Sequence, residues 1–373
     1  MSAAAAAAAM PTCTSTSTPD IDELLKHQTF KTLTPEQVAS FLRHGFLRIP
    51  GAIPPETCDR WTAQVWPRLG MDPSDQSTWH TERSHMPKLH MEPARDLAPL
   101  AWQAICELCG GEDRIVMPGG GMWTDAFIVN LGKPDTPKDK KVPPRELTNW
   151  HVDGDFFVHF LDSPEQALLV IPCWDDVGEN AGATWICDEG PRRIGKLLYD
   201  HPEGLNPMLN PRHEARRPAF EYSVPNKIVQ SASDSSFHEM TGKKGDVILM
   251  HPLMLHSASV NHHQPPVSLR SPFQFDRADP STYSLVELKT MRDLLGQQDI
   301  DMAALRNWKP TATREMFRPD RMAAQEKKRD AEIARLRARG IEIEDPEFNQ
   351  GPAIMFAQQK EKQELEEEAG AVR

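Results

Sequence analysis

The sequence predicts a mainly β core, a sandwich or a barrel, with helices on both sides of it in the chain. Between about residues 115 and 275, short runs rich in Val, Ile, Phe and Trp recur, as in DAFIVNLG, QALLVIPCW, GATWICDEG and GDVILMHPLMLH. Clusters of Pro, Gly and Asp separate these runs. Apolar runs of this length, bounded by turn-forming residues, are typical of the strands in all-β sandwiches and barrels.

A helix and a strand are expected before this core. In LTPEQVASFLRHGFLRIPG, Thr34 is suited to the N-cap, Pro35 to the first helical position and Gln37 to the capping-box position. Gly45 then marks a turn, because glycine commonly ends a helix in the left-handed conformation. The segment FLRIPG that follows is expected to be a strand.

Three regions differ in composition. Residues 1–25 begin with MSAAAAAAAMPTCTSTSTPD, which has little to bury and predicts a disordered low-complexity tail. Residues 26–280 are expected to form the β domain with its N-terminal helices. Residues 281–373 predict a helical, charged extension, whose intermixed charges are typical of a solvated helix face. We expect its last helix either to cover one end of the barrel or to mediate contacts in a homo-oligomer.

Charge and hydropathy exclude several classes of partner. The chain has 54 acidic and 42 basic residues and a net charge of -12, which disfavours binding to the phosphates of nucleic acids or to anionic lipids. No apolar run is long enough to span a membrane, and the N-terminus lacks the pattern of a secretory signal. We therefore expect a cytoplasmic protein.

Cys106 and Cys109 form a C-x-x-C without a second pair, and they are expected to be ordinary half-buried cysteines.

The segment TNWHVDGDFF contains the first candidate site residues. On an extended strand, residues two positions apart point to the same face, so His151 and Asp153 present a nitrogen and an oxygen toward a common point. This H-x-D pattern is weak by itself, because a structural hydrogen bond between the two side chains explains it equally well. A third donor is available in GDVILMHPLMLH, which carries His251 and His256. Two histidines and one carboxylate predict a site for Fe(II) that leaves coordination positions open.

A possible anchor for an acidic cosubstrate follows the second histidine segment. Arg270, in VSLRSPFQF, lies where the next strand should begin. A guanidinium within a barrel needs a carboxylate partner, and a dicarboxylate cosubstrate would provide one. A surface arginine is the alternative explanation.

These motifs together resemble the phytanoyl-CoA dioxygenase-like family of Fe(II)/2-oxoglutarate-dependent oxygenases, over roughly residues 33 to 277. The resemblance is carried by LTPEQVASFLRHGFLRIPGAIPPETCDRW, WHVDGDFF, ENAGATWICDEG and GDVILMHPLMLHSAS followed by the arginine. It implies a double-stranded β-helix, that is, a jelly-roll or cupin-like barrel. It also implies iron on His151, Asp153 and His256, with 2-oxoglutarate held by Arg270.

The resemblance further distinguishes between neighbouring residues. The family pattern places the ligand at the second histidine of HPLMLH, so His256 is the expected ligand and His251 a supporting or core residue. Thr184 matches a position that hydrogen-bonds 2-oxoglutarate in some relatives, although an ordinary strand threonine is the alternative. Two departures from the pattern are Ala258, where the family has a small polar residue, and CDEGPRR, which replaces the family's PGSH turn.

The function implied is a dioxygenase, an oxidoreductase that uses Fe(II), 2-oxoglutarate and O2. We expect hydroxylation of an unactivated carbon in a small-molecule or lipid-like substrate, with release of succinate and CO2. Desaturation would leave the same motifs. Two other hypotheses are a non-catalytic sensor or scaffold that binds metal and 2-oxoglutarate, and a β-sandwich with accidental histidines. The last of these predicts that the two ligand segments are not neighbours.

Overall fold

The computed structural model describes most of the chain. The described residues are 21–117, 119–131, 142–212, 214, 223–257, 264, 266–318 and 320–341. Helix α1 (Ile21–Leu25) occupies the last residues of the expected tail, and Ile21 is buried. The last five residues of the predicted tail are therefore helical, and its other residues lie outside the described residues.

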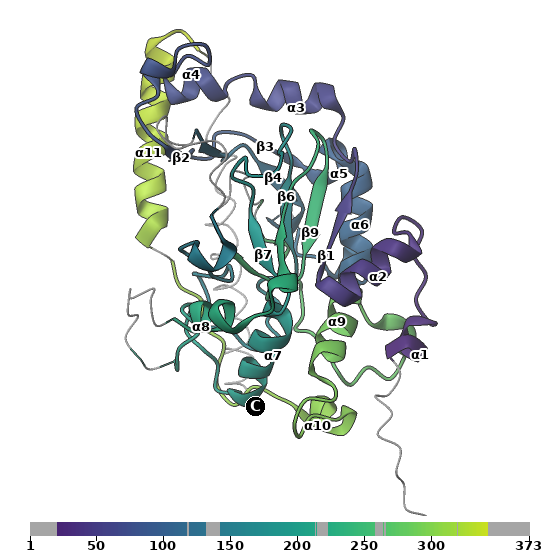
Figure 1. Ribbon diagram of the computed structural model, residues 1–373. Coiled ribbons are helices and arrows are strands. Elements are labelled where there is room, and N and C mark those ends of the chain that lie inside the picture. The colour runs from purple at the N-terminus through teal and green to yellow at the C-terminus, as the bar shows by residue number, and fades with distance from the viewer. Residues whose placement is uncertain are drawn as a thin grey trace, which may run out of the picture.

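Two antiparallel sheets form the centre of the molecule (Figure 1). The first sheet has the order β1-β9-β6, and the second has the order β10-β7-β8. The strands are β1 (Phe46–Ile49), β6 (Leu169–Pro172), β7 (Trp185–Cys187), β8 (Phe237–Glu239), β9 (Val247–Met250) and β10 (Leu255–Ser257). Two smaller sheets pair β2 (Arg83–His85) with β5 (Ile128–Asn130) and β3 (Met91–Pro93) with β4 (Met122–Thr124).

Isolated bridges widen both large sheets. Leu168 pairs with Val267, and Ile115 pairs with Leu269, so two further segments continue the first sheet beyond β6. On the second sheet, the His151 segment pairs with β10. Residues far apart in the sequence thereby become neighbours at the edges of both sheets.

The two faces of the first sheet bury different partners. On β6 and β9, Leu169, Ile171, Ile248 and Met250 belong to the same buried cluster as Ile186 of the second sheet. The alternate residues of these strands belong to the main core, which also contains the helices. Because side chains alternate along a strand, one face of the sheet packs on the second sheet and the other packs on helices. The core is therefore a cupin-like β-sandwich.

Helices cover the outer face of the first sheet. In Figure 1, α2, α6 and α9 lie on one side of β1 and β9. The helices are α2 (Pro35–His44), α3 (Pro55–Thr62), α4 (Val65–Leu69), α5 (Ala94–Leu97), α6 (Pro99–Cys109), α7 (Gly190–Asp200), α8 (Val224–Ser231), α9 (Leu285–Leu294), α10 (Met302–Asn307) and α11 (Asp320–Ala338). Short 3-10 helices occupy Gln76–Thr78, Glu112–Arg114, Gly119–Gly121, Pro144–Glu146, Asp234–Ser236 and Pro280–Thr282. No described helix is both long enough and apolar enough to cross a membrane.

The expectation of a mainly β protein is wrong. Helix accounts for 39% of the structure and strand for 16%, and no barrel is closed among the described residues. The physical reason is that the strands of the core are only three or four residues long. Helices before and after the core supply most of the remaining regular structure.

Helix α2 confirms the capping pattern read from the sequence. The hydroxyl of Thr34 accepts a hydrogen bond from the amide of Gln37, and the side chain of Gln37 accepts one from the amide of Thr34. Pro35 begins helix α2, and Gly45 ends it with a φ of 74°. The chain then enters β1 directly, so the end of α2 is fixed against the first sheet.

The described part of the C-terminal region packs on the rest of the chain. Nearly all residues of α9 are buried, and α9 lies in the main core together with α2 and α6. Helix α9, which follows the expected boundary at residue 281, therefore shares a core with the β domain. Helix α11 packs on its own chain through Ile333 and Leu336, which contact Leu89, and Arg68 Nε donates a hydrogen bond to Glu332 at 2.6 Å.

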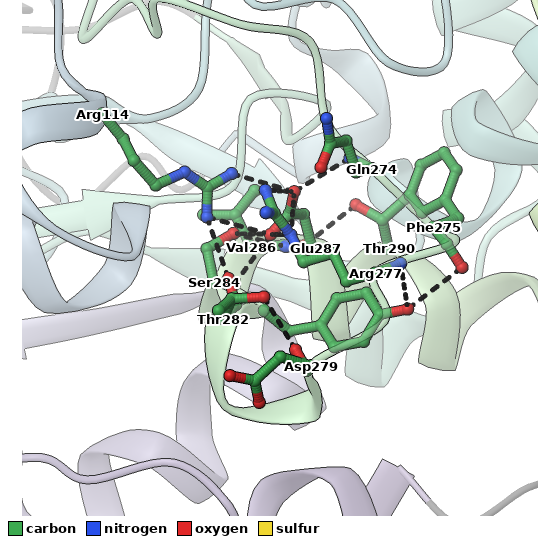
Figure 2. A network of polar contacts seen from close by, with 11 residues as sticks. Arg114, Gln274, Phe275, Arg277, Asp279, Thr282, Ser284, Val286, Glu287 and Thr290 are labelled. Carbon is green, nitrogen blue, oxygen red and sulfur yellow. Dashed lines mark hydrogen bonds and ion pairs between the residues drawn. The ribbon is translucent and has the colours of Figure 1, made fainter.

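A buried glutamate joins α9 to the end of the sandwich (Figure 2). The Glu287 side chain is fully buried and accepts hydrogen bonds from the guanidinium groups of Arg114 and Arg277, at 2.9 and 2.8 Å. It also accepts from the backbone amide of Gln274 and from the amide and hydroxyl of Ser284. Burial raises the pKa of Glu287, but these donors and the two arginine charges outweigh it and hold the pKa below its usual value.

We predict that Glu287→Ala destabilises the fold by about 3–5 kcal/mol, because it leaves two arginines without their buried carboxylate. Urea unfolding at pH 7 measures this loss. The control is Glu326→Ala, since Glu326 pairs with Arg318 on an exposed surface and should cost less than about 1 kcal/mol. Because the pKa of Glu287 is lowered, its contribution is present above the unfolded-state pKa and is lost as the pH falls through the folded-state value. Equal stability of the two variants would contradict the prediction.

Candidate metal centre

The backbone brings the predicted ligands together. The amide of His151 donates to the carbonyl of His256, and the amide of His256 donates to the carbonyl of His151, both at 3.0 Å. The two imidazole rings lie with their centroids 4.3 Å apart. Oδ1 of Asp153 is 3.4 Å from Nε2 of each histidine, and the candidate ligand atoms all lie within 4.8 Å of one another. The hypothesis of accidental histidines is therefore wrong, because its ligand segments would not be neighbours.

Both imidazoles are oriented by backbone carbonyls. Nδ1 of His151 donates to the carbonyl of Asn149 at 2.7 Å, and Nδ1 of His256 donates to that of Met254 at 3.0 Å. A proton on Nδ1 leaves the lone pair on Nε2, the atom that faces Asp153. Metal-binding histidines are commonly fixed in this way by a hydrogen bond from the other ring nitrogen. Asn149 adopts a φ of 66°, which asparagine tolerates better than most residues.

The three side chains differ in exposure. The side chain of His256 is 3% exposed, whereas those of His151 and Asp153 are 38% and 32% exposed. The cluster therefore has one closed side and one open side. Burial lowers the pKa of His151, but the hydrogen bond and charge of Asp153 outweigh it and raise the pKa above its ordinary value.

The loop after the cluster contains a histidine that the sequence analysis did not identify. His159 is buried, and its Nε2 lies 3.0 Å from the carbonyl oxygen of Gly154. Burial lowers the pKa of His159 to about 4, so it is neutral and donates to that carbonyl. Gly154 has a φ of 119°, and a Cβ there would lie 2.6 Å from the His159 ring. In the sequence, the glycine next to Asp153 was the signal that could have indicated this close contact.

The two histidines of HPLMLH have different environments. His251 is completely buried, with Nε2 2.9 Å from the hydroxyl of Thr290 and Nδ1 accepting from the amide of Leu253. Burial holds the pKa of His251 well below its usual value. His251 is therefore a neutral core residue, whereas His256 lies in the cluster.

The two residues expected to bind 2-oxoglutarate are placed differently. Thr184 is fully buried and lies two positions before Ile186, the direct partner of His256 across β7 and β10. Thr184 therefore shares the face of the sheet that carries His256. Arg270 is exposed, and its backbone amide donates to the carbonyl of Arg114 at 2.8 Å. The described residues provide no contact between the Arg270 side chain and the metal-ligand cluster. Ala258 lies outside the described residues.

The C-terminal region contacts the segment that follows Asp153. The amide of Phe317 donates to the carbonyl of Phe156, and the amide of Val158 donates to that of Glu315. At the start of α11, the guanidinium of Arg321 pairs with the carboxylate of Asp155. Helix α11 is thus attached to the segment that follows Asp153, a placement that no motif indicated.

We predict that His256→Gln lowers the affinity for Ni²⁺ by at least about 100-fold, because His256 is expected to be a direct ligand, and loss of a direct ligand costs more than loss of a supporting hydrogen bond. The matched variant His251→Gln should keep the wild-type affinity, since His251 lies in the core. Isothermal titration calorimetry with Ni²⁺ measures both affinities, after circular dichroism has shown that each variant is folded. Retention of affinity in His256→Gln with loss in His251→Gln would reverse the assignment.

Comparisons with known proteins give a family and a set of remote structural similarities. HygX from Streptomyces hygroscopicus, with nickel and 2-oxoglutarate bound, is 12% identical; the match covers 64% of this chain and 86% of that chain, with a TM-score of 0.31. The epimerase SnoN from nogalamycin biosynthesis is 16% identical, with coverages of 63% and 80% and a TM-score of 0.30. Similarities at this level establish no shared activity.

The sequence comparisons are more decisive. Among proteins with curated descriptions, none matches this chain. The family model of phytanoyl-CoA dioxygenase matches residues 41–264, which is more than half of the chain and includes all three candidate ligands. The chain therefore belongs to the phytanoyl-CoA dioxygenase family, a family of Fe(II)- and 2-oxoglutarate-dependent enzymes.

Proposed function

We propose that the protein is a dioxygenase that hydroxylates an unactivated carbon of a small-molecule or lipid-like substrate and releases succinate and CO2. The observation that supports this proposal best is the arrangement of His151, Asp153 and His256. Two imidazole nitrogens and one carboxylate oxygen face a common point, and this donor set fits Fe(II). Three protein ligands leave further coordination positions for 2-oxoglutarate and O2.

The residues of the cluster have separate roles in this proposal. His151, Asp153 and His256 hold the iron, which together with 2-oxoglutarate and O2 supplies an oxidant able to attack an unactivated carbon. The buried His256 forms the closed side of the site. The exposed edges of His151 and Asp153 mark the side from which a substrate reaches it. Asn149 and Met254 keep the proton of each histidine on Nδ1.

Thr184 and Arg270 are proposed to bind 2-oxoglutarate. Thr184 directly precedes β7 and lies two positions before Ile186, the partner of His256, so it shares the face of the sheet that carries His256. For Arg270, the alternation of the segment provides support: Val267 and Leu269 pack in the main core, so Arg270 belongs to the opposite face. Its exposed guanidinium would have to turn inward when it binds the distal carboxylate.

The substrate is expected to enter beside α11. This helix is fixed to the segment after Asp153 through the pair between Arg321 and Asp155. A cytoplasmic location and a homo-oligomer remain proposals from the sequence. The last helix expected from the sequence, in QQKEKQELEEEAG, lies outside the described residues, whereas α11 packs on its own chain.

We predict that the protein forms succinate from 2-oxoglutarate in the presence of Fe(II), O2 and a cell extract that contains the substrate. The double variant His151→Ala, Asp153→Ala should reduce succinate formation to background, because both residues are metal ligands in the proposal. The exposed His80, changed to alanine, is the control and should leave turnover unchanged. An iron-loaded wild type that binds 2-oxoglutarate but forms no succinate with any extract would favour the non-catalytic sensor or scaffold.

We also predict that Arg270→Ala weakens 2-oxoglutarate binding about 10- to 100-fold, the effect of losing about 1.5–3 kcal/mol from a charged hydrogen bond. Arg270→Lys should restore part of the affinity. The control Arg337→Ala removes an exposed arginine of α11 and should have no effect. Calorimetric titration of 2-oxoglutarate into the Ni²⁺-loaded protein gives the affinities. An unchanged affinity in Arg270→Ala would show that another residue holds the distal carboxylate.

A further inference from the structure

A second cluster of two histidines and one aspartate lies outside the proposed active site. Nδ1 of His44 is 2.7 Å from Oδ2 of Asp188, and Nε2 of His238 is 3.0 Å from the same oxygen. The candidate ligand atoms of the three residues all lie within 4.8 Å of one another. We propose that His44, Asp188 and His238 form a second metal site that binds Zn²⁺ or a similar divalent transition-metal ion.

Three separate elements hold these side chains in place. His44 is the last residue of α2, and the left-handed Gly45 turns the chain into β1 immediately after it. His238 is the central residue of β8 and pairs with Ile186 of β7. Asp188 follows β7, and its amide donates to the carbonyl of Ser236 at 2.9 Å. The cluster therefore rests on the regular structure of a sheet and a capped helix.

The donor set suits a borderline-soft cation. Imidazole nitrogen and carboxylate oxygen are both common ligands of Zn²⁺, which prefers four ligands. The side chains of His44 and His238 are 33% and 28% exposed, and that of Asp188 is 14% exposed. A metal held by these three residues therefore has one side open to water, which can complete the coordination.

Local electrostatics favour a cation at this place. His44 lies at the C-terminal end of α2, where the helix dipole stabilises positive charge. Phe46 forms an apolar wall, with its ring centroid 5.4 Å from that of His238.

The second cluster shares a sheet with the first but is separate from it. Ile186 pairs with His256 on one side and with His238 on the other. All three side chains therefore point to the same face, and two strand spacings, about 10 Å, separate the two histidines. Metal ions that act jointly on one substrate lie about 3.5–4 Å apart. The second ion would therefore not join a two-metal centre; it would connect α2 to the second sheet.

The experiment counts bound metal in four forms of the full chain, by titration with Co²⁺ followed by absorption and by elemental analysis of Zn²⁺ after dialysis. Wild type should bind two equivalents. The double variant His151→Ala, Asp153→Ala should keep only the equivalent bound at the second cluster. The double variant His44→Gln, His238→Gln should keep only the equivalent bound at the first cluster. The combination of all four changes should bind none. Tetrahedral Co²⁺ gives intense visible absorption, which should persist in the variant without the first cluster.

A readout of stability tests the connection between α2 and the sheet. Zn²⁺ should raise the Tm of the double variant His151→Ala, Asp153→Ala. It should not raise the Tm of the triple variant that also carries Asp188→Asn. The asparagine keeps the size of the aspartate side chain but removes its charge. The Asp188→Asn variant also replaces the double glutamine variant should that one fail to fold. Binding of a single equivalent by wild type, or two equivalents retained in His44→Gln, His238→Gln, would overturn the proposal.

Discussion

The pair of backbone hydrogen bonds between His151 and His256 is the constraint on which the site depends. Each residue donates to and accepts from the other, so the two imidazoles leave neighbouring strands on the same face. No additional strand or helix is needed to place Asp153 beside the two histidines. It lies two residues after His151, and residues two positions apart on an extended segment point to the same face. If this pairing shifted by one residue, one histidine would point to the other side of the sheet.

The rest of the fold maintains that pairing. The apolar contact of β6 and β9 with Ile186 holds the second sheet against the first, and helices cover the outer face of the sandwich. Glu287 connects α9 to Arg114, whose carbonyl binds the amide of Arg270. A closed barrel is not needed to assemble the ligands, because only the pairing of the His151 segment with β10 brings them together.

The second sheet supports two clusters with the same composition. Ile186 lies between His256 and His238, and each histidine faces an aspartate supplied by a different segment. His151 and His256 are oriented by backbone carbonyls, which fits a site that must keep open positions in a defined geometry. The cluster of Asp188 lies instead at a junction between α2 and the sheet, which fits a role in holding elements together.

The sequence by itself determined the features that local spacing controls. The H-x-D motif placed His151 and Asp153 on one face, and the capping residues Thr34 and Gln37 defined the start of α2. The family pattern selected His256 over His251. Both are buried, but His256 lies beside Asp153, whereas His251 contacts Thr290 of α9. These features depend on neighbours a few residues away, so a motif contains the information that fixes them.

Tertiary structure alone decided the features that join distant segments. The second cluster combines a helix end, a strand and a loop, and no spacing in the sequence relates His44 to Asp188 or His238. The burial of α9 was not predicted, because its charged residues, such as Glu287, find their partners only in the folded chain. The placement of Arg270 likewise depends on where its strand ends. Long-range packing, which the sequence does not encode by local periodicity, sets each of these positions.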